Sequence, residues 1–410
     1  MSKVLGIIAE YNPFHNGHLY HIMKSKQKAQ ADFCIAVIGG NFTQRGEPSL
    51  LDKWSKAESA LLNGVDLVLE LPTLYATSSA ENFADGAIKL LNSLKIVDTL
   101  SFGAENAHID ILDDFAEVLY KEPKQFKTLL SAELKKGVSY PKARETALMM
   151  YLNDIKKYLN VLSSPNNILG IEYLKALKKS KSRIEPIAIK RINSIHNDTK
   201  LSGNIASASA IRKLLQEDEI YKIENFMPIS SYSILKKNIN QGHILNSLST
   251  YEREIIYSIR LMSVDELGEF QDVSEGLENL IKKAADSCNN ISDLIKIVSS
   301  KRYTSTRIQR ILLYILLDIT KKDIQFSKKI IPYARILGFN ENGKKLISKI
   351  VEANPKIDFV SSVNRFVTEC PDNNLQRLLA KDILATNIYT LGYTDDSQSN
   401  LDYTKKIISI

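Results

Sequence analysis

The chain has 410 residues and a mass of 46.2 kDa, a length that predicts roughly two or three domains. Its 44% hydrophobic and 25% charged residues are ordinary globular values, which exclude a disordered or fibrous chain. The three cysteines, Cys34, Cys288 and Cys370, are far apart, which argues against a disulfide framework and a zinc ribbon and favours a reducing cytosol. No apolar stretch approaches the about 20 residues that a membrane-spanning helix needs. We therefore expect a cytoplasmic protein that does not bind a membrane.

In the first half of the chain, short apolar stretches that predict strands alternate with amphipathic stretches that predict helices. The predicted strands are Lys3–Ala9, Phe33–Ile38, Asp66–Leu71, Ile96–Phe102 and Ile184–Ile189. The predicted helices are His18–Gln30, Lys53–Leu62, Ala80–Leu94 and Ile109–Lys121. This alternation predicts an α/β fold with a Rossmann-like, doubly wound parallel sheet and helices on both faces.

The second half reads differently, because glycines become sparse and helical periodicity dominates from about Pro228 onward. We therefore predict a catalytic α/β domain over residues 1–225 and a mainly helical domain over residues 226–410. The net charge of the chain is +7, and residues 301–350 alone hold 12 Lys and Arg against 3 Asp and Glu. This local surplus predicts a basic patch and an anionic partner.

The segment Glu10–His18, EYNPFHNGH, follows the first predicted strand and precedes the first predicted helix. Ligands bind at such turns in doubly wound sheets, and a helix N-terminus favours phosphate. Gly17 would let the backbone approach a ligand closely. His15 and His18 could donate hydrogen bonds to phosphate oxygens and gain charge as pyrophosphate leaves. The alternatives are a metal pair, although two ligands on one helix would prefer a spacing of four, or two incidental surface histidines.

A second motif, ASASAIR, spans residues 206–212 and opens a predicted helix. Arg212 could clamp a triphosphate with two hydrogen bonds. The alternative is a plain surface helix with Ser207 as its N-cap.

These two motifs resemble the H-x-G-H and I-S-S-T-x-I-R signatures of the nucleotidyltransferase superfamily, which class I aminoacyl-tRNA synthetases share. In the second motif Ala206, Ala208 and Ser209 replace Ile, Ser and Thr, so one hydroxyl contact is lost or supplied elsewhere. Over its whole length the chain resembles one particular family, the tRNA(Met) cytidine acetate ligases. The segments that carry this resemblance are residues 6–18, 40–46, 66–72, 102–105, 166–170, 190–191 and 301–304.

The resemblance implies an ATP-dependent ligase. Acetate would first be adenylated to acetyl-AMP with release of pyrophosphate. The acetyl group would then pass to the exocyclic amine of the wobble cytidine of elongator tRNA(Met), forming N4-acetylcytidine. The resemblance also implies ATP and Mg²⁺, with the phosphates rather than a carboxylate cage holding the metal, and no obligatory protein partner.

The resemblance also assigns residues to these steps. His15, His18 and Arg212 would be catalytic. The ATP-binding residues would be Ile7, Ile8, Ala9, Glu10, Tyr11, Asn12, Pro13, Phe14, His15, Asn16, Gly17, His18, Leu19, Tyr20, Gly103, Asn166, Arg191, Ser209 and Arg212.

Several of these residues have simpler interpretations. Gly103 could serve only a turn, Asn166 could be an N-cap, and Arg191 could be a surface arginine. We place acetate or the α-phosphate near residues 40–46, which could instead be an ordinary flexible lid.

The basic residues Lys301, Arg302, Arg307 and Arg310, with Tyr303 beside them, are predicted to bind RNA, because the wobble base must be splayed out and its stem held. A solvated helix surface is the alternative interpretation of such a run.

Other functions use the same motifs. A nucleotidyltransferase for a small coenzyme precursor would not need the second half of the chain, and an acetate-activating ligase for a protein thiol would differ only in its acceptor. An RNA-binding protein with a vestigial nucleotide site is the non-enzymatic alternative, against which the intact His15, His18 and Arg212 argue.

Overall fold

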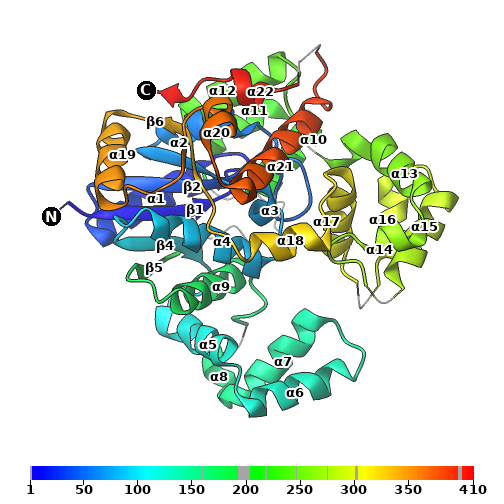
Figure 1. Ribbon diagram of the computed structural model, residues 1–410. Coiled ribbons are helices and arrows are strands. Elements are labelled where there is room, and N and C mark those ends of the chain that lie inside the picture. Colours follow the sequence, from blue (N-terminus) through cyan, green and yellow to red (C-terminus); the bar gives the residue numbers. More distant parts are fainter. Residues whose placement is uncertain are drawn as a thin grey trace.

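The computed structural model of the chain describes residues 2–158, 160–192, 204–217, 219–245, 247–274, 276–300, 303–395 and 399–410. An eight-stranded sheet lies at the centre of this described part (Figure 1). Its strands are β1 (Val4–Ala9), β2 (Phe33–Gly39), β3 (Leu67–Leu71), β4 (Thr99–Ala104), β5 (Glu185–Lys190), β6 (Ala334–Phe339), β7 (Phe359–Val360) and β8 (Ile408–Ser409).

The first five strands run parallel in the order β5-β4-β1-β2-β3, which confirms the predicted fold class. All five predicted strands form, although β4 begins at Thr99 rather than at Ile96. The strand order reverses at β1, which pairs with β2 on one side and with β4 on the other. A doubly wound sheet has its ligand crevice at such a reversal, beyond the carboxyl ends of the strands.

The second half, predicted to be mainly helical, also contributes three strands to this same sheet. Strand β6 pairs antiparallel with β3, and β7 and β8 pair parallel with β6. These strands were missed because β6 is a six-residue apolar run in a basic, helical region, and its partner β3 lies more than 260 residues earlier. Local periodicity carries no information about such a pairing. The division into domains at residue 225 stays a prediction.

Helices cover both faces of the sheet, as side-chain alternation along its strands requires. On one face, Ile7, Ala36 and Val68 pack against α1 (Asn16–Ala29) and α2 (Lys53–Leu61). On the other face, Ile8, Val37 and Leu69 pack against α4 (Ala80–Ser93) and α9 (Pro165–Lys179), and α5 (Ile109–Lys121) packs on α9. The four helices predicted in the first half are all present, within two residues of their expected ends.

Two groups of helices extend from this body (Figure 1). Below it lie α6 (Lys124–Leu134), α7 (Tyr140–Leu152) and α8 (Ile155–Tyr158). To its right lie α13 (Glu252–Leu261), α14 (Val264–Gly268), α15 (Leu277–Ser287), α16 (Ile291–Val298) and α17 (Ser305–Leu316). Within the described residues, no helix is long and apolar enough to cross a membrane.

The remaining helices connect these parts. They are α3 (Thr73–Ala76), α10 (Ala208–Gln216), α11 (Ile220–Ile223), α12 (Ile229–Asn240), α18 (Lys321–Ser327), α19 (Glu341–Ala353), α20 (Val363–Glu369), α21 (Asn373–Thr390) and α22 (Leu401–Thr404), with 3-10 turns at Glu224–Phe226 and Leu248–Tyr251.

Candidate nucleotide site and its supporting charge cluster

A pocket opens at the carboxyl ends of β1 and β4, where the strand order reverses. It is lined by the segment after β1, the loop after β2, the end of β4, and the first turns of α9 and α10. The predicted ATP-binding residues that line it are Ile8, Ala9, Glu10, Tyr11, Asn12, His15, Gly17, His18, Tyr20, Gly103, Asn166, Arg191, Ser209 and Arg212. The fold therefore brings segments that are up to about 200 residues apart in the chain to one crevice.

Five residues of the predicted set do not line this pocket. Ile7 and Phe14 are buried and pack with Leu19 in the core beneath α1 and α2. Pro13 follows a cis peptide bond with Asn12. Asn16 donates its side-chain amide to the carbonyls of Asn204 (2.8 Å) and Asn225 (3.0 Å). The Asn16 amide therefore holds the segment that precedes α10 against the start of α1.

His15 and His18 form the N-terminal cap of α1. The Nδ1 atom of His15 accepts a hydrogen bond from the Gly17 N–H (3.0 Å), and the His15 N–H donates to Nδ1 of His18 (3.2 Å). The two rings stack with their centroids 3.8 Å apart. Because both Nδ1 atoms accept, each neutral ring carries its proton on Nε2. The two rings can therefore each offer one N–H donor to a ligand.

The electrostatics of this cap favour neutral histidines. Burial, followed by the positive charge of Arg191, lowers the pKa of His15 to about 3. Burial also lowers the pKa of His18 well below its usual value, and His15 and Arg191 add to the effect. An unliganded site therefore holds uncharged donors at neutral pH, and only an anion such as a phosphate would favour their protonation.

Gly17 is required by the ring of His15. A Cβ atom at position 17 would lie 2.8 Å from Cε1 and 3.0 Å from Nδ1 of that ring. The glycine thus lets the capping histidine fold over the helix start, which is a more specific reason than the close ligand approach that the sequence suggested.

The second motif reaches the pocket from α10. Ser207 caps this helix by accepting a hydrogen bond from the Ala210 N–H (3.1 Å), so the capping interpretation holds for Ser207. Arg212 lies one turn further on and donates to the carbonyl of Asn12 (2.9 Å), with Glu47 at 3.8 Å. Ser209 lines the pocket with its hydroxyl 3.0 Å from that of Ser207. The capped helix therefore also carries a guanidinium group to the motif at the start of α1.

The third wall is formed around β4 and β5. The Arg191 N–H donates to the carbonyl of Ala104 (3.0 Å), and its guanidinium lies 3.8 Å from Glu105. Asn166 does not cap α9, whose N-cap is Ser164, but donates its side-chain amide to Glu105 (2.6 Å). A Cβ atom at position 103 would lie 3.5 Å from Cγ of Arg191, an ordinary contact distance, so Gly103 leaves the Arg191 side chain room. Glu105 thus orients the two predicted nucleotide ligands Asn166 and Arg191.

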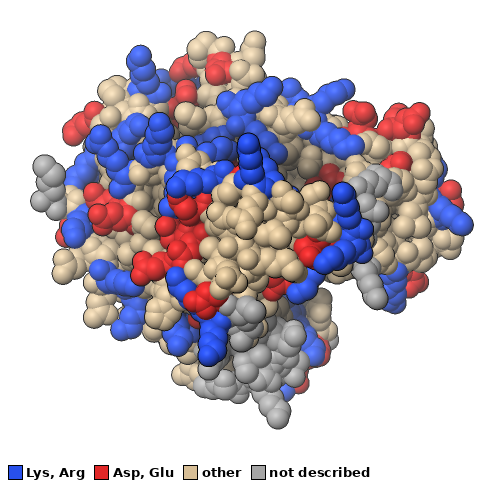
Figure 2. Space-filling view, turned by 90° about the horizontal axis from the view of Figure 1, so that it is seen from below, with Lys and Arg blue, Asp and Glu red and all other residues tan. Residues whose placement is uncertain are grey.

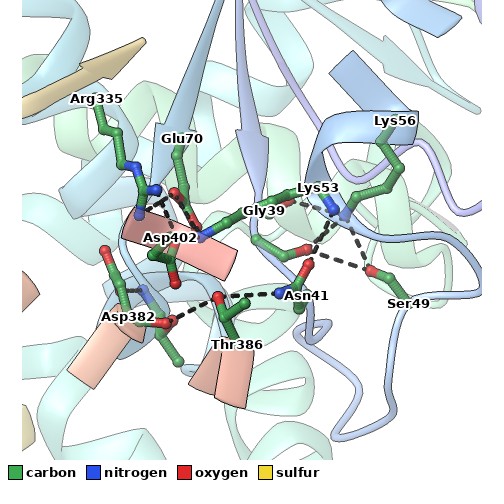
Figure 3. Close-up of polar contacts among 12 residues, drawn as sticks. Gly39, Asn41, Ser49, Lys53, Lys56, Glu70, Arg335, Asp382, Thr386 and Asp402 are labelled. Carbon is green, nitrogen blue, oxygen red and sulfur yellow. Dashed lines mark hydrogen bonds and ion pairs between the residues drawn. The ribbon is translucent and has the colours of Figure 1, made fainter. Parts of the chain in front are cut away.

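A loop over residues 39–49 forms the remaining wall and contributes Thr43, Gln44, Arg45 and Glu47. Lys56 holds both ends of this loop. Its ammonium group donates to the Gly39 carbonyl (2.8 Å) and the Ser49 hydroxyl (2.9 Å), as Figure 3 shows, and also to the Gly40 carbonyl (2.6 Å). The loop is therefore anchored at its base, which argues against the flexible-lid interpretation.

Behind this loop lies a buried charge cluster, formed by Lys53, Glu70, Arg335 and Asp402 (Figure 3). Lys53 lies 2.9 Å from Glu70 and 2.7 Å from Asp402. Arg335 lies 3.2 Å from Glu70 and 2.5 Å from Asp402. Burial raises the pKa of Asp402, but the charges of Lys53 and Arg335 outweigh burial and lower it to about 2. The cluster joins α2, β3, β6 and α22, so the last residues of the chain support the sheet beside the pocket.

The predicted RNA-binding residues are placed only in part. Lys301 and Arg302 lie outside the described residues. On α17, Arg307 donates to the Asp272 carbonyl (2.6 Å) and the Ser274 hydroxyl (3.0 Å), and Arg310 pairs with the Asp272 carboxylate (3.1 Å). These arginines hold the Asp272 turn against α17, and their contact with RNA stays a prediction.

Within the described residues 303–350, the basic side chains do not form one patch. Arg335 is buried in the charge cluster, and α19 lies at the opposite side of the molecule from α17 (Figure 1). On the face shown in Figure 2, basic side chains are spread widely with acidic ones among them.

Sequence reasoning missed several groups that shape the pocket. Lys56 and Glu105 lie outside any chemical motif, and Tyr173, which lines the pocket, sits in an ordinary helical pattern. The only signal was the position of Glu105 in the segment 102–105 that carried the family resemblance. Their roles depend on contacts between distant segments.

Comparison with known proteins agrees with this geometry. The family described as HIGH Nucleotidyl Transferase matches residues 2–404. A protein of Caldanaerobacter subterraneus subsp. tengcongensis named tRNA(Met) cytidine acetate ligase is 44% identical over 100% of both chains. One of the same name from Acetivibrio thermocellus is 43% identical over 99% of both. The crystal structure of Thermotoga maritima TmcAL bound with alpha-thio ATP is 34% identical with a TM-score of 0.93, covering 100% of this chain and 99% of that one.

Proposed function

Because the chain belongs to the tRNA(Met) cytidine acetate ligase family, within the HIGH nucleotidyl transferases, we propose that it is an ATP-dependent ligase that acetylates the wobble cytidine of elongator tRNA(Met). Acetate is adenylated to acetyl-AMP with release of pyrophosphate, and the acetyl group then passes to the exocyclic amine, forming N4-acetylcytidine. We place this reaction in the cytosol, where tRNA is found.

The observation that carries the proposal is the stacked pair His15 and His18 at the start of α1, in a pocket that Arg191 and Arg212 also line. Two fixed N–H donors, two guanidinium groups and a helix N-terminus form a strongly anion-binding wall. Such a wall suits a triphosphate, whose charge grows on the leaving pyrophosphate.

In the first step, an acetate oxygen attacks the α-phosphorus in line with the leaving group. The new O–P bond forms as the bond to the bridging oxygen breaks, and that oxygen leaves with the electron pair as part of pyrophosphate. His15, His18 and Arg212 stabilise the departing charge, while Asn166 and Arg191, oriented by Glu105, hold the nucleotide. No covalent enzyme intermediate is needed, so catalysis consists of positioning and electrostatic stabilisation.

The expected need for Mg²⁺ follows from the phosphate groups of ATP. Among the described residues, no group of three or more histidine, cysteine, aspartate or glutamate side chains is arranged to hold a metal ion. Mg²⁺ would therefore arrive with ATP and neutralise phosphate charge, with most of its ligands supplied by phosphate and water.

The second step requires RNA. The wobble base must leave its stack to reach the pocket, and the arm that carries it must be held outside. We propose that the surface around α17, including Lys301, Arg302, Arg307 and Arg310, contributes to this contact. The loop at residues 39–49 adjoins α17, since a Cβ atom on Gly46 would lie 2.5 Å from the Arg310 backbone nitrogen.

The direct test is to incubate the purified chain with ATP, carbon-13-labelled acetate and an unmodified elongator tRNA(Met) transcript, and to digest the RNA for mass spectrometry. The proposal predicts labelled N4-acetylcytidine at the wobble position, dependent on ATP and acetate. A transcript with uridine at that position is the matched control. Label that appears on protein, or a small-molecule product made without RNA, would favour one of the other functions.

A further inference from the structure

Glu10 is a carboxylate in a pocket built for anions. It follows β1 directly, is half-buried and lines the pocket with His15 and His18. One oxygen, Oε1, accepts a hydrogen bond from the Gln44 N–H at 2.8 Å. Within the part of the chain that the structure describes, its other oxygen has no hydrogen bond or ion pair. The carboxylate is therefore oriented but has one oxygen free for a ligand.

The orientation of Glu10 is built into the fold. Gln44 lies in the loop whose two ends are held by Lys56 (Figure 3). The other acidic side chain among the described pocket residues, Glu47, is engaged differently. It lies 3.8 Å from Arg212 and accepts from Gln309 at 3.4 Å. Glu10 is thus the pocket carboxylate that keeps an unused acceptor.

A free carboxylate repels the phosphates of ATP and the carboxylate of acetate, because like charges repel. It suits a group that offers an N–H and must lose a proton. The second step of the proposed reaction supplies such a group, since the exocyclic amine of cytidine becomes acidic as it is acylated.

The surroundings of Glu10 also fit a nucleobase. Tyr173 lines the same pocket, is 2% exposed, and its hydroxyl has no hydrogen-bond partner among the described residues. Burial, and then the charge of Glu10, raise the pKa of Tyr173, so its hydroxyl stays a donor. Phe83 and Phe102 line the pocket as well, and the Phe102 ring lies 5.7 Å from that of Tyr173. An acceptor, a donor and aromatic walls match a cytosine edge, which presents an amine beside a ring nitrogen that accepts.

We propose that Glu10 is the general base of the acyl-transfer step, an assignment that rests on the proposed function. The cytidine amine attacks the acetyl carbon of acetyl-AMP, and the new C–N bond forms. The bond between the acetyl carbon and the phosphate oxygen breaks, and its electron pair leaves with AMP. The amine proton passes to the free oxygen of Glu10 and from there to water.

The test separates the two half-reactions with the variant Glu10→Gln. The glutamine carbonyl can still accept from the Gln44 N–H, so the loop keeps its contact while the base is lost. Adenylation is measured as acetate-dependent exchange of pyrophosphate into ATP. Transfer is measured by adding prepared acetyl-AMP to the enzyme and an unmodified elongator tRNA(Met) transcript. Glu58→Gln, on α2 and outside the pocket, is the matched control.

We expect Glu10→Gln to lower transfer by about 10²- to 10⁴-fold, the usual range for a lost general base, and to lower exchange by a much smaller factor. Equal losses in both assays would place Glu10 in adenylation, and unchanged transfer would show that it is no base; either result overturns the assignment. Absence of both activities in the wild-type chain would instead overturn the proposed function.

Discussion

The pocket and the buried charge cluster lie on either side of the loop at residues 39–49, and they use charge in opposite ways. In the cluster, each cation lies between carboxylates, as Lys53 does between Glu70 and Asp402. In the pocket, the histidine pair keeps its Nε2 donors and Glu10 keeps one oxygen. Both regions contain buried polar groups, but in the cluster every charged group is paired with one of opposite sign, whereas in the pocket the histidine pair and Glu10 line an open crevice.

This difference distinguishes residues that stabilise the fold from residues that take part in the reaction. A buried ion that lacks a partner destabilises the fold, so internal pairing indicates a structural role. A polar group that stays available at a crevice is stable only because water or a ligand completes its bonds. Substitutions in the cluster should therefore reduce stability, and substitutions in the pocket should reduce activity.

The largest expected effect is on stability. Lys53→Met leaves Glu70 and Asp402 facing each other with only Arg335 between them, and should lower the free energy of unfolding by about 3–5 kcal/mol. Urea unfolding of the purified variant measures this loss. Lys26→Met is the matched control, because Lys26 is partly exposed and lies 3.5 Å from Asp66, a pairing worth no more than about 1 kcal/mol. Equal losses in both variants would show that the cluster has no special role.

The next effect is on chemistry. His18→Ala removes one donor to the leaving group and should lower the rate of tRNA acetylation about 10²- to 10³-fold. It should cost only about 1 kcal/mol of stability, the value of a helix cap. His108→Ala, outside the pocket, should leave the rate unchanged. The account would be contradicted if the His18→Ala enzyme lost its stability but still acetylated tRNA at the wild-type rate under conditions that keep it folded.

A smaller effect per pH unit is expected from the histidine cap. The folded pKa of His15 is about 3, against about 6.5 in an unfolded chain. The unfolded chain therefore binds a proton that the folded chain excludes, and stability is complete above about pH 6.5 and falls as pH drops toward 3. One such group contributes about 1.4 kcal/mol per pH unit within this window. His15→Asn, which can still cap the helix, should reduce that slope in urea titrations; an unchanged slope would contradict the neutral-histidine account.

The smallest effect is expected on α17. Arg310→Ala removes a half-buried pair with Asp272 and should cost about 1 kcal/mol of stability. If the predicted RNA contact exists, tRNA binding weakens irrespective of the RNA sequence. The slope of log affinity against log salt concentration then becomes shallower by about one unit. Filter binding at several salt concentrations measures both. An unaltered salt dependence would restrict Arg310 to its structural contact.

The sequence predicted much of this pocket because its essential parts are local. The segment Glu10–His18 joins a strand to a helix over nine residues, and the helix start, glycine and histidines can all be recognised there. The parallel sheet followed from alternation of apolar and amphipathic stretches. Arg212 was recognised because it, too, lies in a short motif.

What could not be predicted depends on pairings between distant segments. Strand β6 forms because it pairs with β3. Arg335 belonged to the basic surplus of the sequence, and only the fold places it beside Glu70 and Asp402. For Asn166 the sequence left a helix cap and a nucleotide contact equally open, because the position of Glu105 opposite it was unknown. In the same way, only the structure shows that the Gln44 N–H binds one oxygen of the Glu10 carboxylate and leaves the second oxygen available.

The most direct test of the central claim, that the anion-binding groups of the pocket serve carboxylate adenylation, is exchange of labelled pyrophosphate into ATP by the purified wild-type chain. We predict exchange when acetate is present and none when it is omitted. Exchange that is absent with acetate, both with and without bulk tRNA, would contradict the account and indicate nucleotidyl transfer to another acceptor.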